Sequence, residues 1–90
     1  MKNETKKVRQ EVIDAQKDAV VKEVATLEIQ LDFMEKEHEF KVEEATKIKD
    51  KEQKEASLES LANHKLQKIT PMKDNIDYKT KYFDYLSSLE

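Results

Sequence analysis

Residues 20–40, VVKEVATLEIQLDFMEKEHEF, place apolar side chains on two opposite sides of one predicted helix. On a helical wheel of about 100° per residue, one of the two rows repeats at alternating spacings of four and three residues. That spacing is typical of a coiled-coil seam. The predicted dimer or packing seam consists of Ile13, Val20, Val24, Leu27, Leu31 and Met34.

A second apolar row lies about 140–220° around the same wheel. It is formed by Ala25, Ile29, Phe33 and Phe40. An irregular amphipathic helix is one interpretation, but two apolar rows are better explained by a helix that is covered from both sides. We therefore expect a hairpin to cover one side of residues 13–45 and a second subunit to cover the other.

The composition favours helices throughout. Charged residues make up 41% of the ninety residues, glycine and cysteine are absent, and proline occurs once. Lys, Glu, Ala and Leu form helices readily, whereas tight turns and strands would use other residues. A chain of this length buries only about 60% of its unfolded surface and has no disulfide to add stability, so self-association is expected. The predicted fold class is all-α: a long helical hairpin or coiled coil with a shorter aromatic C-terminal helix, in a dimeric bundle.

The distribution of charge favours a hairpin. Residues 23–44 carry eight acidic and two basic side chains (net −6), whereas residues 1–22 and 45–68 each carry six basic and four acidic ones (net +2). A reversal in the high forties to low fifties would lay the acidic block along a basic one, although exposed pairs contribute only tenths of a kcal/mol each. Asp50 and Gln53 fit a capping box at the start of a returning helix.

The alternative to a hairpin is a single helix from about residue 4 to 69. It would be roughly 100 Å long at 1.5 Å per residue. The lack of glycine and proline in this part of the chain favours that continuous rod. Both structures therefore remain open at the level of sequence.

The clearest predicted boundary is Thr70-Pro71. Proline disfavours helical geometry in the residue before it, and it suits the first turn of a new helix. The sequence accordingly predicts a helical hairpin or coiled coil over 1–69, a hinge over 70–75 and an aromatic helix over 76–90. That last helix either folds back into the core or contacts a partner, because tyrosine is enriched at binding hot spots. The candidates for partner contact are Tyr78, Tyr82, Phe83, Tyr85 and Leu86.

No residue pattern indicates catalysis. The serines lack a glycine-containing elbow, and phosphate-binding loops require the glycines that this chain lacks. Glu35 and His38 have the Glu-x-x-His spacing with which helical bundles bind a di-iron centre, and a dimer would present the pair twice. The other interpretation is that His38 is a polar seam residue that sets helix register. We predict no enzyme activity and no cofactor, with a di-iron site as a remote alternative.

The predicted function is therefore protein–protein interaction by a small adapter, assembly factor or regulator. In general build only, such a hairpin resembles small secretion chaperones, phage accessory proteins and Rop-like dimers, and no motif is matched residue by residue. A Rop-like nucleic-acid-associated dimer is the alternative. It is disfavoured because acids interrupt the lysine-rich faces and because Arg9 is the single arginine among 17 basic residues.

The same bias toward lysine is typical of AT-rich coding, as in a low-GC bacterium or its phage. No apolar run approaches the length of a membrane span, and the first residues lack the apolar stretch of a signal peptide. A cytoplasmic location is the expectation.

Overall fold

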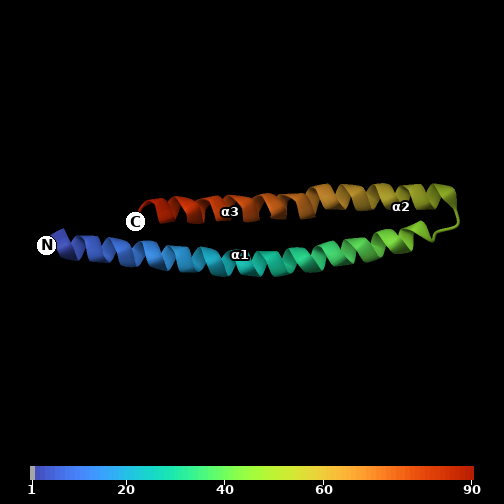
Figure 1. Ribbon diagram of the computed structural model, residues 1–90. Coiled ribbons are helices and arrows are strands. Elements are labelled where there is room, and N and C mark those ends of the chain that lie inside the picture. Colours follow the sequence, from blue (N-terminus) through green and yellow to red (C-terminus); the bar gives the residue numbers. More distant parts are fainter. Residues whose placement is uncertain (1) are drawn as a thin grey trace.

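The protein is an antiparallel helical hairpin in the computed structural model, which describes the backbone of residues 2–90 and the side chains of residues 4–90 (Figure 1). The hairpin measures 74 × 16 × 12 Å. No strand occurs in residues 2–90, which confirms the all-α class, and the reversal excludes the continuous rod. Within the same range, no helix is long and apolar enough to cross a membrane. The elements are α1 (Lys2–Thr46), α2 (Lys51–His64), the π-helical turn η1 (Lys65–Ile69) and α3 (Thr70–Ser88).

The reversal between α1 and α2 lies where the charge pattern places it. The N–H groups of Lys47 and Ile48 bond to carbonyls three residues earlier, at 3.1 and 3.2 Å, and tighten the end of α1. Asp50 then caps α2, because its Oδ1 accepts hydrogen bonds from the backbone N–H groups of Glu52 and Gln53 at 2.9 and 3.2 Å. The predicted N-cap is therefore confirmed.

Loss of this cap has a measurable cost. Asp50→Ala removes the acceptor of two N–H groups that have no partner within the helix, so we expect the free energy of unfolding to fall by about 1 kcal/mol. Urea unfolding followed by circular dichroism measures the change. Asp77→Ala, at an exposed position inside α3, is the matched control and should change stability by less than about 0.5 kcal/mol. Equal losses in the two variants would contradict a capping role.

The π-helical turn η1 follows from the spacing of the inward-facing residues. These residues repeat at heptad spacings of three and four on either side of η1, but the step from Leu61 to Ile69 is eight residues and not seven. A π turn holds one extra residue without breaking the ladder, and here the Thr70 N–H bonds to the Lys65 carbonyl, five residues earlier. Both stripes therefore face α1: Leu58, Leu61, Ile69, Met72, Ile76, Lys79, Phe83 and Leu86 are all buried or half-buried.

Residues 70–75, the predicted hinge, are helical in the structure. Thr70 is helical, with φ −59° and ψ −46°, and Pro71 lies in the first turn of α3. Pro71 follows η1, in which a hydrogen bond spans five residues. The N–H that proline lacks therefore falls at the transition from π-helical to α-helical hydrogen bonding. The aromatic segment therefore continues the returning arm (α2, η1 and α3) and does not form a separate third helix (Figure 1).

The core is one row of side chains thick. Its main cluster joins Ile13 and Val20 of α1 to Leu86 of α3, and Val24 and Phe83 pack against it. Among residues 4–90 no polar or charged residue is buried. Such a thin core leaves the outer sides of both helices to solvent or to other molecules.

Candidate protein-docking surfaces

The predicted seam lies between α1 and the returning arm. Ile13 and Val20 are buried, and the rest of the seam is half-buried: Val24, Leu27, Leu31 and Met34. This row thus forms the α1 half of the intramolecular core. A second copy cannot use it unless the hairpin opens.

Among residues 4–90, three ion pairs join the two arms of the hairpin beside this core. The ammonium of Lys79 lies 2.7 Å from the Glu23 carboxylate, and that of Lys73 lies 3.4 Å from Glu35. The lysines that pair with the acidic residues of 23–44 thus belong to α3 and not to residues 45–68. This acidic part of α1 lies opposite a later part of the returning arm than the charge pattern predicts. All these groups retain solvent contact, so each pair contributes little stability.

The third ion pair lies near the open end of the hairpin. The ammonium of Lys17 is 2.7 Å from a Glu90 carboxylate oxygen and 5.1 Å from the centre of the Phe83 ring. The hydrogen bond from Lys17 lowers the pKa of Glu90 below its usual value. Lys17 is thus half-buried beside Phe83, at the edge of the main core cluster.

The two candidate metal ligands have other partners. Glu35 forms the ion pair with Lys73, and Nε2 of the half-buried His38 donates a hydrogen bond of 3.0 Å to the Leu61 carbonyl. That carbonyl also accepts the Lys65 N–H, at the start of the π-helical turn. In the described part of the chain, no group of three or more His, Cys, Asp and Glu side chains is placed to hold a metal ion. The geometry therefore gives His38 a structural contact between the two arms.

The second apolar row lies mainly on the side of α1 away from the core, and we call it the outer row: Ala25, Ile29, Phe33 and Phe40. Its two end residues, Ala25 and Phe40, also border shallow grooves between the two arms. The three large side chains are between 61% and 69% exposed. No part of the described chain covers them. An exposed row of two phenylalanines and an isoleucine on one helix is typical of an interaction surface.

The aromatic residues of α3 divide between the core and the surface. Leu86 is 2% exposed and therefore not available to a partner in the closed hairpin, whereas Phe83 is half-buried against it. Tyr78, Tyr82 and Tyr85 stay accessible, and the last two rings stack with their centres 6.3 Å apart. We call these three residues the tyrosine face.

A shallow groove of about 310 Å³ runs beside the tyrosine face. Its walls come from both arms: Gln16, Ala19, Val20, Glu23, Tyr78, Lys79 and Tyr82. The ion pair between Glu23 and Lys79 closes one rim and neutralises both charges. The groove therefore offers small apolar side chains and tyrosine rings to a ligand, with little net charge.

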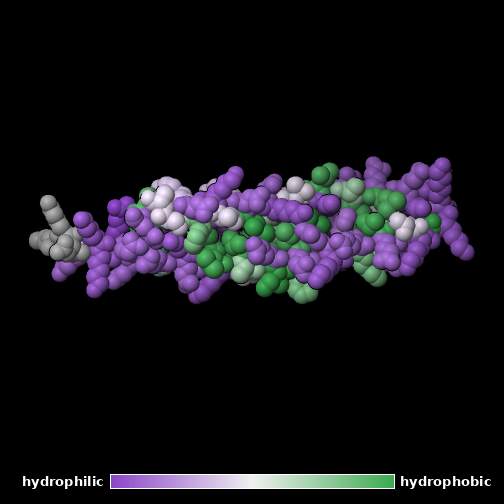
Figure 2. Space-filling model, viewed as in Figure 1, coloured by the Kyte–Doolittle hydropathy of each residue, from purple (hydrophilic) through white to green (hydrophobic). Residues whose placement is uncertain are grey.

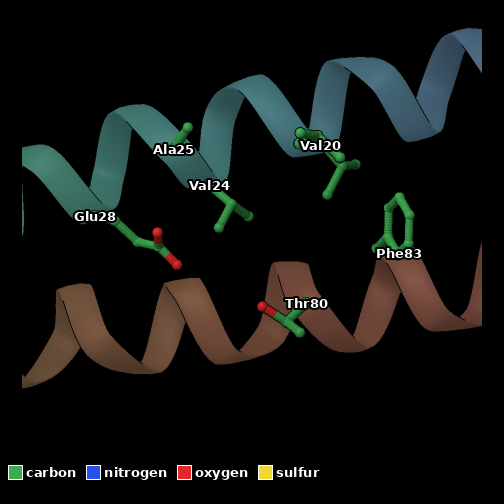
Figure 3. A pocket seen from close by; sticks show the side chains of 7 residues that line it. Val20, Val24, Ala25, Glu28, Thr80 and Phe83 are labelled. Atoms are coloured by element: carbon green, nitrogen blue, oxygen red, sulfur yellow. The ribbon is translucent and has the colours of Figure 1, made fainter.

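The opposite flank of the hairpin carries a more apolar groove of about 290 Å³, the valine groove (Figure 3). Val20 and Val24 point toward α3 there, Phe83 points toward Val20, and Glu28 lies at one end. In the space-filling view this flank shows a continuous hydrophobic area bordered by hydrophilic residues (Figure 2). The lining residues are Val20, Val21, Val24, Ala25, Glu28, Thr80 and Phe83.

Comparisons with protein-family models, with curated proteins and with solved structures find no match for this chain. The chemistry of its own surfaces therefore carries the functional argument. Sequence reasoning identified the outer row and the tyrosines but missed the valine groove. Val21 and Thr80 belong to no apolar stripe of their own helices, and only the register between the two arms brings them together.

Proposed function

We propose that the protein is a non-enzymatic interaction module, an adapter, assembly factor or regulator that binds another protein by helix-on-helix contact. The observation that carries this proposal is the tyrosine face, three accessible tyrosines on one flank of a helix. Tyrosine contributes a large contact area at a small entropic cost and is enriched among the residues that dominate binding energy. Occlusion of the partner or scaffolding is the mechanism, and no chemical step is involved.

The support under the tyrosine face favours binding without rearrangement. Leu86 and Phe83 of the same helix pack into the core, so the backbone that carries the tyrosines is held against α1. A surface that is already ordered loses little conformational entropy when a partner docks. The adjacent groove fits an apolar side chain of a partner helix, since its one ion pair is satisfied within the hairpin.

The proposal is tested by removing the tyrosine rings without disturbing the core. The double variant Tyr78→Ser, Tyr85→Ser is compared with the wild type and with Leu66→Ser, which removes an equally exposed apolar side chain from the π-helical turn. Proteins captured from a lysate of the encoding organism are quantified by mass spectrometry. We expect a partner that binds the wild type and Leu66→Ser but is depleted at least about tenfold with the double variant, because hot-spot truncations cost 1–2 kcal/mol or more.

The captured partner is then purified and titrated against the same three proteins by calorimetry. A loss of affinity restricted to the tyrosine variant would support a direct contact. Identical capture by all three proteins would contradict the proposal that the tyrosine face binds a partner.

A further inference from the structure

We propose that the outer row is the contact between two copies of this chain, which pack α1 against α1 in antiparallel orientation about a two-fold axis between Asp32 and Phe33. The inference rests on the proposed function and specifies how the interaction module self-associates. It concerns a different face of the hairpin from the tyrosine face, which stays free for another protein in such a dimer.

The surface area of the hairpin leaves room for a second copy. Its accessible surface is 7274 Å², whereas a compact monomer of 10.6 kDa is expected to expose about 5,500 Å². A stable interface buries about 800 Å² on each partner. The excess of about 1,800 Å² follows from the elongated shape of the hairpin, and the outer row is the part of α1 where the largest apolar side chains are exposed.

The sizes of the side chains in the outer row are complementary when two copies run antiparallel. About the proposed axis, Phe40 of one copy faces Ala25 of the other, so a large side chain meets a small one in the manner of a knob and its hole. Ile29 faces the aliphatic stem of Lys36. The two copies of Phe33 lie next to the axis and shield each other from water.

The charges at the two ends of the outer row select the same arrangement. Asp18 and Lys22 form an ion pair of 3.1 Å at one end, and Glu44 and Lys47 form one of 3.0 Å at the other, in the same acid-then-base order. Antiparallel packing places Lys22 beside Glu43 and Glu44 of the second copy and Asp18 beside its Lys47. Parallel packing would place each charge beside its own equivalent. Electrostatic complementarity therefore favours the antiparallel register and disfavours the parallel one.

The first test reverses one charge and then restores complementarity within the same chain. Lys22→Glu is expected to raise the dimer dissociation constant about three- to tenfold, since it changes two symmetry-related contacts. Adding Glu43→Lys should return the constant to within about twofold of the wild type. Sedimentation equilibrium measures all three proteins. Lys81→Glu, at an exposed position on α3, alters the net charge equally and should leave the constant unchanged.

The second test uses the absence of cysteine from the chain. Single variants Lys22→Cys and Glu43→Cys are mixed and treated with a short bismaleimide. The antiparallel dimer should yield cross-links between the two variants and almost none within either, because equivalent positions would lie about 30 Å apart along the helices. Cross-links of each variant with itself would overturn the inference.

Phe33→Glu separates failure of this inference from failure of the proposed function. It changes an exposed residue, so helicity should be retained while the dimer is lost. A wild-type chain that stays monomeric would overturn the inference and leave the tyrosine face to its own test. A dimer that is unaffected by both Phe33→Glu and Lys22→Glu would show that self-association uses another face.

Discussion

Leu86→Ala is expected to lower the free energy of unfolding of the hairpin by about 2–5 kcal/mol. Leu86 lies at the centre of the main core cluster with Ile13 and Val20, and it is 2% exposed. Truncation of a buried leucine costs about 2–5 kcal/mol, and a chain of this length has a total stability of about 5–13 kcal/mol. A core only one row thick cannot close around the missing side chain from a second layer. Urea unfolding monitored at 222 nm should therefore show a midpoint well below that of the wild type.

The matched control for this variant is Leu66→Ala. It makes the same chemical change in the same helical arm, but Leu66 is 66% exposed. We expect a change below about 0.5 kcal/mol, so the difference between the two variants isolates the effect of burial. Similar losses for Leu66 and Leu86 would mean that the returning arm does not pack with Leu86 inward. Both variants need to be compared at one protein concentration, because dimerisation adds to apparent stability.

Local sequence signals predicted the turn correctly. Asp50 was identified as a cap because its side chain can reach N–H groups two and three residues later, and that geometry depends on nothing outside the turn. The seam was likewise visible in the spacing of apolar residues on α1. The charge blocks favoured the hairpin over the continuous rod without deciding between them.

The errors came from register between distant segments. Pro71 is the more visible signal in the sequence, but the eight-residue step from Leu61 to Ile69 determines where the helix becomes irregular. Similarly, a wheel of α3 alone places Leu86 beside the tyrosines. Which edge of that stripe is buried depends on how α3 aligns with Ile13 and Val20, and the sequence of α3 does not encode that alignment by itself.

Deletion of Gln67 is expected to leave the hairpin folded, with a stability within about 1 kcal/mol of the wild type, and to convert η1 into regular α-helix. Removing one residue shortens the step between Leu61 and Ile69 to seven, so both apolar stripes face α1 without a π turn. Gln67 is exposed, so its side chain contributes nothing to the core.

Deletion of Asp77, an equally exposed residue ten positions later, is the control and should have the opposite effect. It rotates one part of α3 by about 100° relative to the other. Either Ile69 and Ile76 or Phe83 and Leu86 must then leave the core, at a cost that approaches the total stability of the hairpin. Circular dichroism and urea unfolding distinguish the two deletions directly. If both deletions were equally disruptive, the π turn would not be a register insertion. A folded protein that lacks Gln67 would instead mean that η1 accommodates one extra residue and has no other role in the core.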